Sequence, residues 1–234
     1  MVNKTFRAAA VVTGLPQLWR DLRHLHPGAL VLEEDETLPL APGAHDLLVH
    51  AMALHWANDP LGQLIQARHA LRPDGLLLAV FPGGQTLHEL RAALARAEIE
   101  ISDGLSPRVA PMGELRALGA LLQRAGFALA VADSFTLTAS YSSPLALMRE
   151  LRAMGEGNAL AARLRRPTRR ALIARACEIY TETHGRDGRV PATFELIVLT
   201  GWAPGPGQPR PLRPGSARMR LADALGVTER PLEA

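Results

Sequence analysis

The chain has 234 residues, an apolar fraction of 47% and an aromatic fraction of 4%, which together fit one well-buried domain with a mostly aliphatic core. No apolar run approaches the ~18 residues of a membrane span, and the first residues show no signal-peptide pattern, so we expect a cytoplasmic protein. The single cysteine, Cys177, excludes an internal disulfide and a thiolate metal cluster, and its Ala-rich helical surroundings favour an inert buried thiol over a reactive one.

The formal net charge of +3 and the isoelectric point near 9.7 invite a nucleic-acid interpretation, but the distribution of the charges argues against it. Lys4 is the only lysine, and the arginines are spread along the chain. The one dense run, RLRRPTRR at 163–170, is interrupted by Pro167. We expect a solvated loop or a patch for an acidic partner there, rather than a nucleic-acid groove.

Apolar runs and helical spacings alternate along the first part of the chain. They predict strands at 6–14, at the start of 29–40, from 46 to the His55-Trp56 pair and at 76–84, with helices at 15–25 and 60–75 between them. Asp59, directly before Pro60, is expected to cap the second of these helices.

Two helices at 86–101 and 112–126 follow, then a strand at 127–141, a helical insert at 144–190 and a last strand at 193–204. Strands that are apolar on both faces and alternate with single helices predict an α/β fold, in which helices cover both faces of a mostly parallel, Rossmann-like sheet. We therefore expect an α/β domain over 1–203 and a Pro-, Gly- and Arg-rich C-terminal arm over 204–234.

Several segments carry a resemblance to a known family. The segment EEDETLPLAPGAHDLLV resembles the acidic and Leu-Pro motif that joins strands three and four of class I S-adenosylmethionine (SAM) methyltransferases. ALHWANDPLGQLIQARHALRPDGLLLAVFPGGQTLHELR and PLRPGSARMRLADALG are similar to the branch that contains the mitochondrial complex I assembly factor and the malonyl-carrier-protein methyltransferase. The similarity covers about residues 29–226 and implies the methyltransferase fold, with SAM as the cofactor.

The N-terminal part departs from that family. There, the first strand ends in a glycine-rich loop that holds the methionine end of SAM, because side-chain-free backbone must approach the cofactor closely. This chain has no such loop, so we describe the expected sheet as N-terminally truncated. By spacing, AAAVVTGLPQLW stands where the family has its second strand, and the acidic residue that binds the ribose falls at Gly14.

Losing the family's first strand, which lies in the middle of the sheet, would leave buried amides unpaired at about 1–3 kcal/mol each. Strand 6–13 could move into the central position, another chain could cover the gap, or an upstream segment could precede Met1. We expect the first or the third. In the first case, TGLP becomes a reduced cofactor loop with one glycine.

The resemblance implies a site at the carboxyl edge of the sheet. The implied cofactor-binding residues are Gly14, Glu34, Asp35, Leu54, His55 and Trp56. The implied catalytic residues are His55, Trp56, Tyr141, Glu156 and Asn158, because the insert covers the active site in the family.

Each of these assignments has a purely structural alternative. Trp56 could be a packing residue and His55 a satisfied, partly buried histidine. Tyr141 could be an ordinary end-of-strand tyrosine, and Glu156 and Asn158 exposed neighbours of a helix C-cap. The eight histidines lack the paired spacings of zinc sites, so we expect no metal.

The resemblance thus implies a SAM-dependent methyltransferase-family protein that acts on a protein substrate in respiratory complex I assembly. The alternative is a non-catalytic scaffold or assembly protein that has lost SAM binding. The expected partner is a protein substrate or an assembly partner, a homodimer stays open, and neither nucleic acid nor a membrane span is expected.

Overall fold

The computed structural model describes residues 4–15, 17, 19–20, 24, 26–102, 104–209, 215–216 and 219–228. In chain order its elements are β1 (Ala9–Thr13), β2 (Leu30–Glu33), β3 (His45–Ala51), the 3-10 turn η2 (Leu54–Trp56), α2 (Pro60–Ala70), β4 (Leu71–Pro82), α3 (His88–Ser102), α4 (Leu115–Arg124), β5 (Ala128–Tyr141), α5 (Pro144–Ala153), α6 (Arg170–His184), β6 (Val190–Trp202) and α7 (Leu221–Leu225).

The strands form one six-stranded sheet in the order β2-β1-β3-β4-β6-β5. β1 pairs in parallel with both β2 and β3, β3 pairs in parallel with β4, and β6 runs antiparallel to β4 and β5. The expected mostly parallel sheet is confirmed, and its antiparallel pairs are those of β6. Strand β1 lies directly against β3, with Val11 opposite Val49, so the N-terminal strand takes the central position described above as the first alternative.

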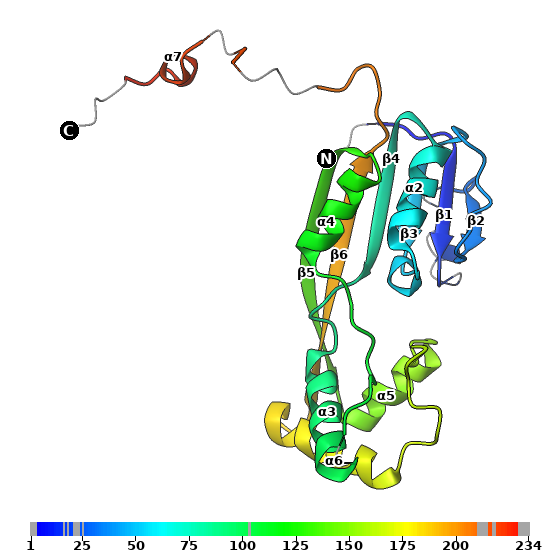
Figure 1. Ribbon diagram of the computed structural model, residues 1–234, viewed down its shortest axis with the longest axis vertical. Coiled ribbons are helices and arrows are strands. Elements are labelled where there is room, and N and C mark those ends of the chain that lie inside the picture. The colour runs from blue at the N-terminus through cyan, green and yellow to red at the C-terminus, as the bar shows by residue number, and fades with distance from the viewer. Residues whose placement is uncertain are drawn as a thin grey trace.

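Helices α2 and α4 cover one face of this sheet (Figure 1). In β4, Leu77, Ala79 and Phe81 are buried at alternate positions, as a strand that presents one face to a helix layer requires. They pack with Leu64 of α2 and Leu122 of α4 in one apolar core. The cap predicted for α2 is confirmed, because the Asp59 carboxylate accepts a hydrogen bond from the Gly62 amide at 2.8 Å.

The opposite face of the sheet is accessible along strand β5. Val131, Phe135 and Leu137 occupy alternate positions of this edge strand and are 57%, 48% and 52% exposed. The intervening Ala130 and Ala132 pack on the α4 side. The sheet therefore presents an apolar strip at its β5 edge, on the face away from α4.

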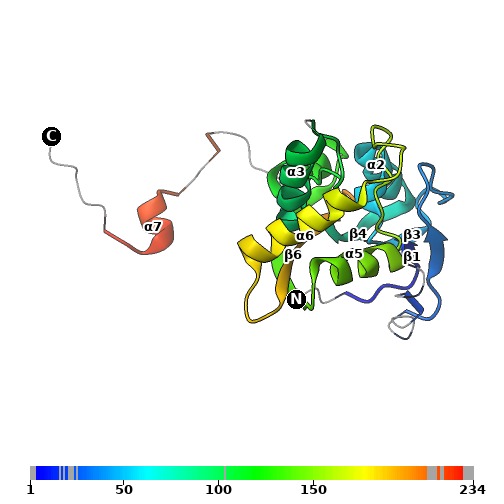
Figure 2. The same cartoon turned by 90° about the horizontal axis from the view of Figure 1, so that it is seen from below.

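A helical lobe lies beyond the carboxyl end of β4 (Figures 1 and 2). Helices α3, α5 and α6 pack there against the ends of β5 and β6 around a second apolar core. At its centre, Tyr180 is fully buried and donates a hydrogen bond to the Pro191 carbonyl at 2.7 Å. Because β5 and β6 run through both lobes, the sheet fixes how the helical lobe stands below the carboxyl edge of β1–β3.

The C-terminal segment with α7 extends away from both lobes in the two views (Figures 1 and 2). Among the described residues, no helix is both long and apolar enough to cross a membrane.

Candidate functional site

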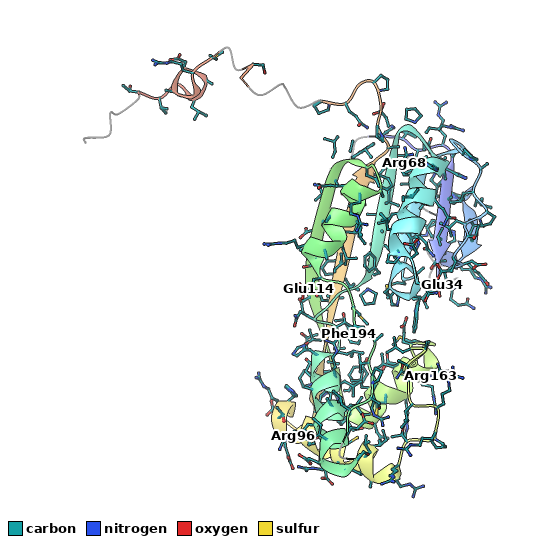
Figure 3. The ribbon with its side chains drawn as sticks, in the orientation of Figure 1. Glu34, Arg68, Arg96, Glu114, Arg163 and Phe194 are labelled. Atoms are coloured by element: carbon teal, nitrogen blue, oxygen red, sulfur yellow. The ribbon has the colours of Figure 1, made fainter. Side chains whose placement is uncertain are left out.

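The carboxyl ends of β1, β2 and β3 meet at one edge of the sheet, where ligands bind in open α/β folds. Gly14 follows β1, Glu34 follows β2, and Met52 follows β3 in a left-handed conformation with φ of 52°. That conformation is uncommon for a residue with a side chain. It ends the strand abruptly and turns the chain into η2. Figure 3 shows Glu34 at this edge, on the side that faces the helical lobe.

Gly14 is where the chain needs a residue without a side chain. A Cβ atom at this position would lie 2.6 Å from the Met52 carbonyl oxygen and 3.0 Å from Glu34 Oε2. The three residues that end neighbouring strands therefore touch one another, and any larger residue at position 14 would force backbone apart.

His55 is the buried polar centre of the edge. Its side chain is 5% exposed, and its Nε2 lies 3.4 Å from Oε1 of Glu156, which follows α5 in the helical lobe. Neither ring nitrogen makes a hydrogen bond within the described part of the chain. A buried polar group without such a bond needs a physical explanation, and a ligand at this position would supply one.

Glu34 completes an acidic recess around His55. Burial raises the pKa of the Glu34 carboxyl above its ordinary value, the nearby His55 lowers it, and Glu156 raises it further. We call the place between the Glu34 and Glu156 carboxylates, beside His55, the acidic recess. Two carboxylates that disfavour each other's charge suit it to a cationic group.

The acidic segment after β2 is held in place by α2. Gln63 Nε2 donates to the Asp35 carbonyl at 2.8 Å, and Gln66 Nε2 donates to the Glu36 carbonyl at 2.9 Å. The Glu36 carboxylate in turn accepts hydrogen bonds from the backbone and side-chain amides of Asn58. Glu34 and Asp35 thus project from an anchored segment.

His50 of β3 contacts the Gln63 side chain. The two side chains lie 2.8 Å apart, and because the Gln63 amide nitrogen is used by Asp35, its oxygen accepts from His50 Nε2–H. His50 Nδ1 is then unprotonated, and it is buried without a partner among the described residues. Burial lowers the pKa of His50 to about 4, the Gln63 hydrogen bond raises it, and His55 lowers it.

A pocket of about 200 Å³ opens beside the recess, lined by Glu34, Asp35, Glu36, Ala53, Trp56, Ala57 and Gln63. Carboxylates and one indole face are suited to the amine and hydroxyl groups and the flat base of a nucleoside. The volume is below the ~300 Å³ at which small-molecule sites begin, so it suits part of a cofactor.

The residues present fit the adenosine half of SAM and do not fit its methionine half. In the described residues, the only glycine that follows the central strand is Gly14, and the space in front of its Cα is taken by Met52 and Glu34. Among the described residues, this strand end therefore offers no cradle of free backbone amides for the methionine carboxylate.

The remaining predicted site residues lie elsewhere. Leu54 is buried in the sheet core. Asn158 is exposed and donates from Nδ2 to the Pro107 carbonyl at 2.7 Å. Tyr141 belongs to the helical core, where burial and then Glu150 raise the pKa of its hydroxyl.

The structure brings Gly14, Glu34, His55 and Glu156 together, with Trp56 in the adjoining pocket. His50 and Gln63, which position the acidic segment, were not among the predicted site residues. The one sequence signal for Gln63 is that it is a polar residue on the buried side of α2. Among the described residues, no cluster of three or more His, Cys, Asp or Glu side chains could hold a metal ion.

Comparison with curated proteins finds relatives of two kinds. The arginine-hydroxylase NDUFAF5 of zebrafish is 37% identical over 84% of this chain and 61% of its own length, and the human one is 36% identical over 84% and 57%. The malonyl-[acyl-carrier protein] O-methyltransferase of a Methylovorus species is 33% identical over 98% of this chain and 69% of its own length. The chain spans about three fifths of the arginine-hydroxylases.

Solved structures agree on the fold alone. A Bacillus halodurans protein provisionally described as a methyltransferase has a TM-score of 0.50 at 16% identity, covering 86% of this chain and 93% of its own. The YcgJ protein of Bacillus subtilis has a TM-score of 0.51 at 10% identity, covering 84% and 92%. No protein-family model matches the chain.

The comparisons also correct one expectation and settle the family. The cytoplasmic location expected from the sequence is wrong by this measure, because the NDUFAF5 relatives are named as mitochondrial. That expectation depended on the first residues of a chain that spans only part of these relatives. The identity across most of the Methylovorus enzyme and the shared fold place the chain in a family: it belongs to the SAM-dependent methyltransferases, on the branch that contains the NDUFAF5 arginine-hydroxylases and the malonyl-carrier-protein methyltransferases.

Proposed function

We propose that this chain binds a cationic side chain, arginine by preference, of a protein that takes part in respiratory complex I assembly, next to a pocket for the adenosyl end of SAM. The observation that carries the proposal is the meeting of Glu34, His55 and Glu156 beside the 200 Å³ pocket. Arginine is the residue named in the activity of the NDUFAF5 relatives, and the malonyl-carrier-protein relatives act on a protein-borne group.

In this proposal the pocket binds the nucleoside and the recess binds the guanidinium. Trp56 and Asp35 would hold the base and ribose, and Glu34 and Glu156 would neutralise the guanidinium in a site partly shielded from water. His55 Nε2, 3.4 Å from Glu156, is placed to take the proton that a cationic acceptor must lose before it reacts at nitrogen. SAM would supply the activated methyl group on its sulfonium only where its methionine half is held by residues beyond those described.

A second candidate is a non-catalytic scaffold that keeps the recess for docking. The observation that favours it is the crowding at Gly14. A Cβ added there would lie 2.6 Å from the Met52 carbonyl oxygen, so the described residues leave no room for a cradle around the methionine end of SAM. In that case the acidic recess would recognise the partner's arginine without modifying it.

Titration calorimetry with adenosine and with S-adenosylhomocysteine tests the pocket. We expect both to bind with similar affinity, within about threefold, because only the shared adenosine half is gripped. Binding of neither ligand would refute the nucleoside pocket. Asp35→Asn should weaken both ligands, whereas Asp133→Asn, on the exposed edge strand β5, should weaken neither.

Mass spectrometry of an arginine peptide incubated with the protein and SAM separates the two candidates. Gain of a methyl group that depends on His55 supports the enzyme. Peptide binding without any change of mass supports the scaffold.

A further inference from the structure

The densest run of arginines in the chain lies in the helical lobe. Between Glu156 and Glu178 the sequence contains six arginines and no acidic residue. Five of them fall in residues 163–170, which we call the arginine loop, and the chain as a whole carries only +3. The remainder of the chain is therefore net negative, and the positive charge is concentrated at one place.

The arginines of this loop are exposed, and none of them forms an ion pair with a described carboxylate. Residues 161–170 are all exposed. Within the described part of the chain, no carboxylate lies at ion-pair distance from Arg163, Arg165 or Arg166, whereas Arg175 further along contacts Glu100, Glu178 and Glu182. Five like charges held close together without counter-charges destabilise the free protein, so the loop is suited to a partner that brings carboxylates.

The loop is also held in place. Arg108 donates to Thr168 Oγ1 at 2.9 Å and forms an ion pair with the buried Glu98 at 2.6 Å. Asn158 donates to the Pro107 carbonyl and accepts from the Leu160 amide. The loop at Thr168, and the residues just before the loop at Asn158, are thereby tied to the segment that follows α3.

The loop borders the acidic recess. It begins seven residues after Glu156, whose carboxylate lies 3.4 Å from His55 Nε2. Figure 3 shows Arg163 on the helical lobe, on the same side of the molecule as Glu34. A partner that inserts a side chain between Glu34 and Glu156 would therefore pass the arginine loop.

We propose that the arginine loop docks an acidic surface of the same protein that offers its arginine to the recess, so that the acceptor is an arginine flanked by acidic residues. This inference rests on the proposed function and adds the sequence context of the acceptor. Arg163, Arg165 and Arg166 alternate with Leu160 and Leu164, a mixture of guanidinium and apolar groups that is common in protein interfaces. The loop holds no aromatic residue on which bases could stack, which argues against a nucleic acid.

The test uses the full chain and a fluorescent peptide with a central arginine flanked by glutamates, measured by anisotropy. Arg165→Glu with Arg166→Glu should weaken this peptide about tenfold or more, through lost attraction and new repulsion. The matched control is Arg116→Glu with Arg124→Glu, which makes the same change of net charge on exposed positions of α4 and should change affinity less than about twofold. Equal losses in both double variants would overturn the proposal, since they would report net charge alone.

Two further peptides separate the docking surface from the recess. Replacing the flanking glutamates by glutamine should abolish the difference between wild type and the loop variant. Replacing the central arginine by glutamine should weaken binding equally to wild type and to the loop variant. If replacing the flanking glutamates has its effect but replacing the central arginine has none, the recess does not bind the arginine, whereas the loop still binds the acidic residues. Tighter binding of a single-stranded RNA of equal charge than of the acidic peptide would overturn the choice of a protein partner.

Discussion

The protonation of His50 makes stability depend on pH in a way that can be calculated. Burial lowers the pKa of His50 to about 4 in the folded chain, and in the unfolded chain the pKa returns to about 6.5. Between these values the unfolded chain binds a proton that the folded chain does not. The free energy of unfolding therefore falls as pH is lowered through about 6.5, and the loss levels off below about pH 4.

The size of the effect follows from the two pKa values. Lowering the pH from about 7.5 to about 5 should cost about 2 kcal/mol through this one group, since each unit of pKa difference corresponds to about 1.4 kcal/mol. Physically, the proton must go to Nδ1, which is buried without a partner among the described residues, while Nε2–H stays on Gln63.

Urea unfolding of wild type and His50→Gln at the two pH values measures this directly. The variant can still donate to Gln63 but cannot titrate. Other titrating groups contribute equally to both proteins, so the wild type should lose about 2 kcal/mol more than the variant. A difference between the two proteins that stays constant with pH would refute the reasoning.

Three other predictions concern stability and use urea unfolding with a matched control. Gly14→Ala should cost about 1–3 kcal/mol because the new Cβ meets the Met52 carbonyl, whereas Gly28→Ala, with no atom within 4 Å of its Cβ, should show no such clash penalty; equal costs would contradict the contact. Arg108→Ala should cost about 3–5 kcal/mol because it leaves the buried Glu98 carboxylate without its ion-pair partner. The control Arg96→Ala, on the exposed side of α3, should cost less than about 1 kcal/mol. Phe81→Ala should cost about 3–5 kcal/mol at a side chain 2% exposed, and Phe135→Ala, 48% exposed, much less; a comparable loss at Phe135 would mean that the β5 strip is covered in solution.

Local pattern was enough to predict most elements of the fold. The apolar run at 6–14 became β1, and the Asp59-Pro60 pair starts α2 as expected. The predicted helix at 60–75 was too long: α2 ends at Ala70, and β4 begins at Leu71, where it already pairs with His45. That boundary depends on pairing across the sheet, which the spacing of apolar residues within one segment cannot reveal.

The site was predicted in part, and the missing part is long-range. Glu34 and His55 follow strand ends and could be placed at one edge by the rule for parallel sheets. The approach of Glu156 to His55 joins residues about a hundred positions apart and depends on how β5 and β6 carry the helical lobe beneath the edge. The role of Gln63 likewise requires the folded segment after β2, since its partner Asp35 is brought close only by the fold.

The most direct test of the proposed function is the affinity of the acid-flanked arginine peptide for wild type and for Glu156→Gln. The account predicts a loss of about tenfold or more, because one of the two carboxylates that face the guanidinium loses its charge. Glu114→Gln, an exposed carboxylate before α4, should bind the peptide like wild type. Equal affinity of wild type and Glu156→Gln would contradict the claim that the recess between Glu34 and Glu156 receives a cationic side chain.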